Sequence, residues 1–144
     1  MHILNKQLST KELPMVKFGY TIYYVSNVTE ALEFFEKAFN MKRRFLTEEL
    51  DYGELETGET VLAFATHELG KTNFSGGYVS ATDSDKPLGV EIALVTEDVN
   101  LTHASALKHG AKELQKPEQK PWGQVVSHIR CPSGILLELC TPIG

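Results

Sequence analysis

The chain has 144 residues, 42% of them hydrophobic, and a formal net charge of -5 at pH 7. This length suits one compact domain with a real core and is too short for two ordinary domains. The acidic balance excludes a broad basic surface for nucleic acid, and no stretch reaches the roughly 18 apolar residues that span a bilayer. Because the first residues also lack the apolar segment of a signal peptide, we expect a cytoplasmic protein with neither nucleic-acid nor membrane partners.

The first half of the chain is predicted to contain an arm followed by one mixed module. Residues 1–16 have no strong pattern and form an N-terminal arm that either docks on a partner subunit or is loose. The β-branched and aromatic run from Gly19 to Val25 predicts a strand. Asn27 then predicts a helix start, and Asn40 a helix stop after apolar residues at helical spacing. Strand-like runs follow at 43–47, 52–56 and 60–66, which completes a module over residues 17–68.

The second half of the chain is predicted to repeat this order after a connection. Residues 69–87 are rich in Gly, Ser, Thr and Asp and are expected to form a surface linker or a lid. In the second module, residues 88–144, Asp98 can cap a helix that stops at Gly110. The predicted strands around that helix lie near 89–95, 112–116, 124–130 and 135–141.

The two halves also share sequence, which indicates an internal duplication. The run from Gly19 to Ser26 matches the run from Gly89 to Thr96 at an offset of 70, with Gly, Ile and Val in common. Tyr52-Gly53-Glu54-Leu55 matches Trp122-Gly123-Gln124-Val125 at the same offset, and Gly58 to Phe64 matches Gly134 to Leu139 at an offset of 75 or 76. Three matched blocks in the same order are hard to obtain by chance.

Two tandem βαβββ modules resemble the glyoxalase, bleomycin resistance protein and extradiol dioxygenase superfamily, the vicinal oxygen chelate proteins. The endings Tyr-Gly-Glu-Leu at 52–55 and Cys-Pro-Ser-Gly-Ile-Leu-Leu-Glu-Leu at 131–139 carry this resemblance, which extends from about Lys17 to Pro142. It implies an α+β fold in which the modules form a half-open barrel of mixed β-sheet around a pocket. A second subunit often completes that pocket, so the resemblance also implies a homodimer.

The same resemblance implies where a metal ion would bind. Enzymes of the family hold a divalent metal through four side chains, one on the first and one on the last strand of each module. These positions map here to Tyr20, Ala63, Val90 and Glu138, of which only Glu138 is a good ligand. A shift of one residue would replace Val90 by Glu91, but it would move the matched Ile and Val to the other strand face. We therefore expect no metal site and keep a divalent metal near Glu138 as the lesser alternative.

The last hairpin can be predicted from its turn residues. Cys131-Pro132-Ser133-Gly134-Ile135 fits a type I turn followed by a glycine in the left-handed conformation. In that register His128 opposes Glu138 on one strand face. The pair could act as acid and base, could contact a ligand, or could be a buried polar pair without chemistry. Cys140 would lie opposite Val126, too far from Cys131 for a disulfide.

The remaining candidates come from strand alternation. Tyr20, Ile22 and Tyr24 would share the pocket face of the first strand, with Ile92 and Leu94 in the same role in the second module. Trp122, the single tryptophan, lies in a proline-bracketed segment and could form a pocket rim or plug the core. The residues predicted to contact a ligand are Tyr20, Tyr24, Trp122, His128 and Glu138.

The leading prediction is binding of a small, largely apolar organic molecule without a metal, as in bleomycin-binding members of the family. The alternative is a metal-dependent lyase, isomerase or dioxygenase with an altered site at Glu138 and His128 as a replacement ligand. A third reading is an interaction protein whose pocket has no ligand. The sequence leaves enzymatic turnover open, since one fold hosts many functions.

Overall fold

The computed structural model describes residues 12–143 and contains the predicted βαβββ order twice. The α+β class is confirmed. The first module consists of β1 (Tyr20–Val25), α2 (Val28–Phe39), β2 (Lys42–Leu46), β3 (Tyr52–Glu56) and β4 (Val61–Thr66). After α3 (His67–Asn73), the second module consists of β5 (Glu91–Val95), α4 (Val99–Lys108), β6 (Lys112–Gln119), β7 (Val125–Arg130) and β8 (Leu136–Cys140).

The ends of the two long helices are determined by local side chains, as the sequence indicates. Asn27 Oδ1 accepts a hydrogen bond from the Glu30 amide at 2.9 Å, and α2 ends where Asn40 takes a left-handed conformation. Asp98 Oδ1 accepts from the Leu101 amide at 3.0 Å and starts α4 in the same way. These caps place each helix directly after the first strand of its module.

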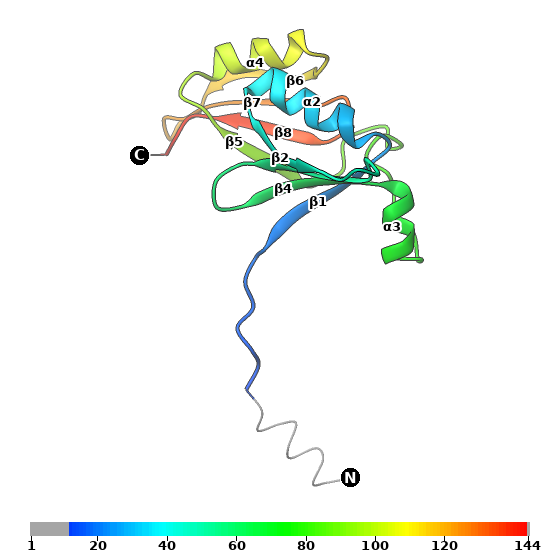
Figure 1. Ribbon diagram of the computed structural model, residues 1–144. Coiled ribbons are helices and arrows are strands. Elements are labelled where there is room, and N and C mark those ends of the chain that lie inside the picture. Colours follow the sequence, from blue (N-terminus) through cyan, green and yellow to red (C-terminus); the bar gives the residue numbers. More distant parts are fainter. Residues whose placement is uncertain (1–11, 144) are drawn as a thin grey trace.

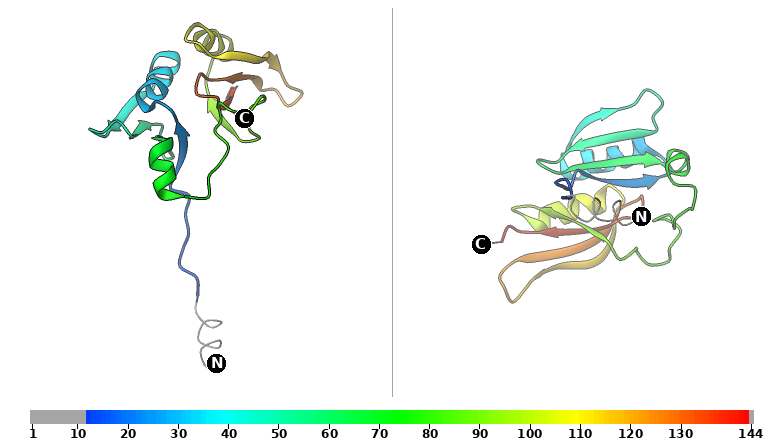
Figure 2. Two further views of the ribbon diagram at one scale, coloured as in Figure 1. Left: turned by 90° about the vertical axis from the view of Figure 1, so that its right-hand side faces the viewer. Right: turned by 90° about the horizontal axis from the view of Figure 1, so that it is seen from below.

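Each module forms its own four-stranded mixed sheet (Figure 1). The strand order is β1-β4-β3-β2 in the first sheet and β5-β8-β7-β6 in the second. In both, the first strand runs parallel to the last strand of the module, and the remaining pairs are antiparallel. The first strand of each module is therefore an edge strand, and Figure 2 shows the two sheets beside each other in one molecule.

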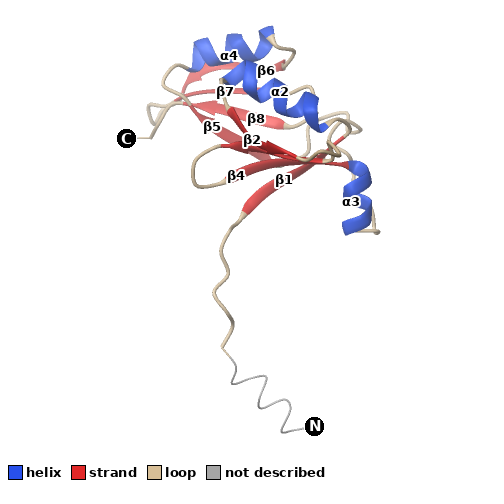
Figure 3. Cartoon of the chain, in the orientation of Figure 1, coloured by secondary structure: helices blue, strands red, loops and turns tan. Residues whose placement is uncertain are grey.

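The core lies between the sheets and the two long helices. Helices α2 and α4 contact each other and lie on one side of the strands (Figure 3). Phe35, Leu32, Leu137 and Leu139 are fully buried beneath them. In residues 12–143, the opposite face of each sheet, here called the outer face, has no long helix packed on it. Side chains that alternate away from the core are therefore free to form a site on the outer face.

The connection between the modules contains a short helix that the sequence pattern does not predict. Thr66 Oγ1 accepts a hydrogen bond from the Leu69 amide at 3.2 Å and caps α3, which takes up the first part of the predicted linker. The rest of the linker is fixed by Arg130. Its Nη2 donates to the carbonyl oxygens of Ala81 at 2.7 Å and Ser84 at 2.9 Å. The connection is thus bound to the hairpin between β7 and β8.

The N-terminal arm is described only in part. Residues 1–11 of the predicted arm lie outside the described residues. Residues 12–19 form no helix or strand, are exposed, and extend away from the two modules (Figure 1). Among the helices of the described part of the chain, none is long and apolar enough to cross a membrane.

Candidate functional site

The hairpin between β7 and β8 has the predicted geometry. Gly134 adopts a φ of 89°, its amide donates to the Cys131 carbonyl at 2.8 Å, and the Cys131 amide donates to the Ile135 carbonyl at 3.0 Å. His128 opposes Glu138 in the resulting register, as predicted. Both cysteines are buried and free, which agrees with the predicted absence of an intrachain disulfide.

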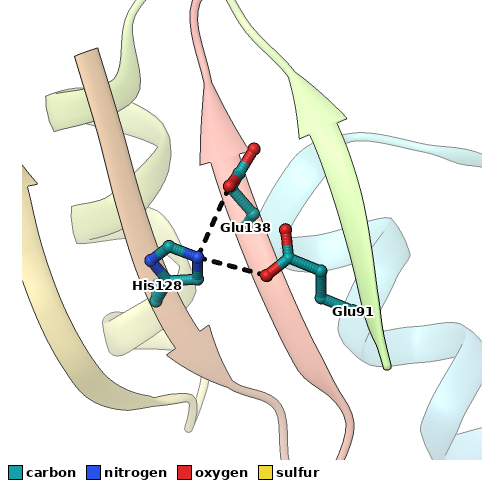
Figure 4. Close-up of side chains that lie close together, drawn as sticks. All are labelled: Glu91, His128 and Glu138. Carbon is teal, nitrogen blue, oxygen red and sulfur yellow. Dashed lines mark hydrogen bonds and ion pairs between the residues drawn. The ribbon is translucent and has the colours of Figure 1, made fainter. Parts of the chain in front are cut away.

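A third side chain joins this pair. Figure 4 shows Glu91 of β5 and Glu138 of β8 pointing toward the imidazole of His128 on β7. His128 Nε2 lies 3.2 Å from Glu91 Oε1 and 3.4 Å from Glu138 Oε1. The three side chains are 24% to 37% exposed, so solvent and a small molecule can reach them. We call these three residues the Glu91 cluster.

The strand register of the second module differs from the one the repeat predicts by one residue. Ala93 opposes Glu138, just as Ile22 opposes Ala63 in the first module, so Glu91 is the counterpart of Tyr20. The mapping of this position to Val90 is therefore corrected to Glu91. Ile92 and Leu94 pack against the core instead of lining the outer face.

The physical reason for the difference is that the shared Ile and Val occupy different faces. Ile22 lies on the outer face of β1, whereas Ile92 points toward the core of the second module. Val25 is 4% exposed and Val95 is 65% exposed. Aligning the two halves by their shared apolar residues therefore paired side chains that point to opposite faces of their sheets.

The Glu91 cluster has the donor set of a divalent metal site. One ligand atom from each residue lies within 4.8 Å of the others. Carboxylate oxygen and imidazole nitrogen suit zinc, manganese, iron and nickel, and three protein ligands leave coordination positions open. The residues present therefore fit the metal that the family resemblance implies.

A buried thiol lies beside Glu138 on β8. Cys140 follows Glu138 by two residues on β8 and is 5% exposed. Burial, followed by the charge of Glu138 and its hydrogen bond, raises the pKa of the Cys140 thiol above its usual value.

The corresponding face of the first sheet carries different chemistry. Glu54 opposes Ala63 and is thus the counterpart of His128, not of Gln124 as the repeat predicts. Its carboxylate accepts a hydrogen bond from the Tyr52 hydroxyl at 2.6 Å, and burial and this hydrogen bond raise the pKa of Tyr52. With Tyr20 and Ala63 at the other two positions, Glu54 is the only carboxylate among these three positions, and none of them is a histidine. Among the described residues of the first sheet, no three metal-ligating side chains converge.

The other predicted contact residues are spread over the molecule. Tyr20 is 55% exposed on β1, and the Tyr24 ring stacks on Tyr78 of the linker with centroids 4.9 Å apart. Trp122 lies in the turn between β6 and β7, where it is 67% exposed and its indole donates to Gln124 at 2.7 Å. This exposure rules out the core-plug interpretation of Trp122. Of the predicted residues, the structure brings His128 and Glu138 together with Glu91.

A second histidine has partners that resemble a catalytic triad. His103 Nδ1 lies 2.8 Å from Ser127 Oγ, and His103 Nε2 lies 2.8 Å from Glu113 Oε2. Ser127 is fully buried, so its hydroxyl cannot reach a substrate. The three residues form a structural connection between α4, β6 and β7 instead of a catalytic group.

Leucine in place of His103 is expected to lower the free energy of unfolding by about 1–3 kcal/mol, because the buried Ser127 hydroxyl loses its partner. Urea unfolding followed by circular dichroism measures the change. Removing Ser127 as well, in the double variant with Ser127→Ala, should recover part of the loss. Equal destabilisation of the single and double variants would show that the hydrogen bond contributes little.

Solved structures with the same fold support the two-module arrangement. A glyoxalase-related enzyme from Fulvimarina pelagi is 16% identical, with a TM-score of 0.73 over 92% of this chain and 94% of that chain. A glyoxalase/bleomycin resistance protein/dioxygenase family enzyme from Burkholderia phytofirmans PsJN is 12% identical, with a TM-score of 0.71 over 88% and 98%. A protein of unknown function from Agrobacterium tumefaciens str. C58 is 17% identical, with a TM-score of 0.72 over 91% and 98%. No curated protein matches at a significant level.

A protein-family model also matches most of the sequence. It matches residues 17–139, which reach from before β1 to Leu139 of β8 and include the whole Glu91 cluster. At identities this low, the solved structures establish the fold and say nothing of the reaction. The chain belongs to the glyoxalase/bleomycin resistance protein/dioxygenase superfamily.

Proposed function

We propose that this protein binds a divalent metal ion at Glu91, His128 and Glu138 and acts there on a small organic molecule that carries oxygen atoms. The observation that supports this function is the convergence of one imidazole and two carboxylates, with ligand atoms within 4.8 Å of one another, on an open sheet face. This is the metal-dependent alternative of the sequence analysis, with Glu91 as the additional ligand.

Each residue of the cluster has a separate role in this proposal. Glu91 and Glu138 supply negative charge, and His128 supplies Nε2, the ring nitrogen that faces both carboxylates. A bound metal would polarise a carbonyl or lower the pKa of a water molecule. The three strands β5, β7 and β8 hold the ligands, and a pleated sheet orients such side chains more rigidly than a loop does.

Binding of an organic molecule without a metal is the second candidate. It is favoured by the outer face of the first module, where Tyr20 and Ala63 stand at positions that hold metal ligands in the family. In this case Glu91 and Glu138 would hydrogen-bond to His128 or accept hydrogen bonds from the ligand. Tyr20 and Tyr24 would then supply aromatic contacts.

We also propose that two copies of the chain associate through their outer faces. Tyr20 on β1 and Val95 on β5 are each more than half exposed on the edge strands of the two sheets. Large apolar side chains that are exposed on one face of a protein mark interaction surfaces. Light scattering should give twice the mass of one chain, and a strictly monomeric protein at micromolar concentration would contradict this proposal.

Metal content distinguishes the two candidate functions. The protein is loaded separately with manganese, iron(II), nickel and zinc, desalted, and measured by elemental mass spectrometry. Near one equivalent per chain is expected for at least one metal, with much less in the His128→Ala variant. Absence of all four metals from the folded protein would overturn the metal-dependent function and leave metal-free binding.

A further inference from the structure

Two adjoining cavities lie where the linker passes the first residues of α2 and α3. The more enclosed cavity, of about 120 Å³, lies between α2 and the turn of the β7–β8 hairpin, and the more open one, of about 360 Å³, lies over α3 and the linker. Both cavities are lined by Ser26, His67, Ser80 and Thr82, and we call them together the linker pocket. No residue of the Glu91 cluster lines it, so it is separate from the proposed metal site.

A chain of hydrogen bonds runs through four side chains of the linker pocket. The Tyr78 hydroxyl lies 2.8 Å from His67 Nδ1, and His67 Nε2 lies 3.4 Å from Ser80 Oγ. Ser80 Oγ lies 3.1 Å from Thr82 Oγ1. When the Tyr78 hydroxyl donates to His67, the chain ends in a Thr82 hydroxyl proton that a ligand can accept; in the reversed direction, the Thr82 oxygen accepts from the ligand. The pocket can therefore serve a ligand group that donates and one that accepts.

The walls of the linker pocket are held in place before a ligand binds. The hydrogen bonds of His67 connect residues 78–80 of the linker to the first residue of α3, the helix that Thr66 caps. Arg130 Nη2 donates to the Ala81 carbonyl at 2.7 Å and so fixes the linker to the hairpin as well. Polar groups that are already oriented lose less conformational entropy when a ligand binds.

The charges at the linker pocket do not favour an anion. Lys71 contributes one positive charge, whereas Glu30 and Asp83 contribute two negative charges. Among the described residues, none of these three side chains forms an ion pair. Carboxylates accept hydrogen bonds, an ammonium donates them, and the hydroxyl groups of the pocket do both. This lining matches a neutral molecule with several hydroxyl groups better than it matches a phosphate or a carboxylate.

The linker pocket also has an aromatic wall and room for a ring. Tyr24 and Phe34 line the smaller cavity, and the Tyr24 ring stacks on Tyr78 with centroids 4.9 Å apart. The electron-rich face of an aromatic ring attracts the weakly positive C–H groups of a saturated ring. An apolar cavity of about 150 Å³ holds the six carbons of benzene, so the larger cavity, of about 360 Å³, has room for about a dozen non-hydrogen atoms.

From these observations we infer that the linker pocket is a second binding site, for a neutral polyhydroxylated molecule the size of a monosaccharide. Its hydroxyl groups bond to Ser80, Thr82 and the carboxylates of the pocket, and its ring packs against Tyr24. This inference goes beyond the proposed function and needs no metal. At the usual affinity per atom, a ligand of about a dozen non-hydrogen atoms has a Kd of about a millimolar.

The ligand class is tested by NMR titration of the full chain after metal has been removed with a chelator. The probes are glucose, galactose, mannose, myo-inositol and glycerol, with cyclohexanol and inorganic phosphate for comparison. At least one of the polyols should shift the amide signals of Ser80 and Thr82 and the ring signals of His67 together. Cyclohexanol has a six-membered ring but a single hydroxyl group, and it should bind about tenfold more weakly, as should phosphate.

Three outcomes of this titration would overturn the inference. Tighter binding of phosphate than of every polyol would show an anion site. Tighter binding of cyclohexanol would show that the hydroxyl groups are not recognised. The third is the absence of a shift with all five polyols at about 100 mM, a concentration far above the expected Kd.

The position of the site is tested with variants of the hydrogen-bonded chain. Thr82→Val keeps the shape of the side chain and should weaken polyol binding about fivefold, and Ser80→Ala, which interrupts the chain, about tenfold. Thr60→Val is the matched control, since Thr60 is also exposed but lies between β3 and β4. Equal affinity of these three variants would overturn the assignment. His128→Ala should leave polyol binding unchanged, so a failure of metal binding would overturn the proposed function alone.

Discussion

Glutamine in place of Glu138 is expected to lower the affinity for a divalent metal about 100-fold or more, which corresponds to about 2.7 kcal/mol. The substitution keeps the shape of the side chain but removes one of the two negative charges that face His128 Nε2. The carboxamide oxygen of glutamine is a neutral and weaker ligand, so Glu91 and His128 would be the only strong ligands left. Isothermal titration calorimetry with the best-bound metal of the loading experiment measures the change.

Glu113→Gln is the matched control for this substitution. Glu113 also pairs with a histidine at 2.8 Å, but that histidine is His103 and its other partner is the hydroxyl of Ser127. The control should therefore bind metal like the unmodified protein. A similar loss in both variants, or unchanged binding in Glu138→Gln, would show that the metal site lies elsewhere.

Alanine in place of Gly134 is expected to lower the free energy of unfolding by about 3 kcal/mol. The residue has a φ of 89°, which is unfavourable for any side chain, and an added Cβ would lie 2.6 Å from the Ala81 carbonyl oxygen. Because that contact is with backbone, the linker would have to move and would weaken its hydrogen bonds to Arg130. Thermal and urea unfolding measure the loss.

The Gly58→Ala variant separates the cost of the unfavourable φ from the cost of the contact with the Ala81 carbonyl. Gly58 has nearly the same φ, 91°, but nothing lies within 4 Å of the position of an added Cβ. The free energy of unfolding of this variant should fall by only about 1 kcal/mol, which is the cost of the unfavourable φ alone. A similar loss at both glycines would mean that the linker is not tightly held on the hairpin.

The sequence by itself determined the module order, the helix ends and the last hairpin of this protein. These features depend on short-range interactions: Asn27 caps α2 through an amide three residues away, and Gly134 supplies the left-handed turn that sets the pairing of His128 with Glu138. The internal duplication indicated the family, because the same strand and turn residues occur in both modules. The helix ends and the hairpin are each encoded within a window of a few residues.

Only the tertiary structure decided which residue of β5 faces the outer side. The pairing of β5 with β8 joins strands separated by more than 40 residues, and a shift of one residue exchanges Val90 for Glu91 without changing the local pattern. The burial of Ile92 and Leu94 against the core selects the observed register, because the alternative would expose both side chains to water. The place of Glu91 in the cluster follows from this long-range packing, which no local sequence signal encodes.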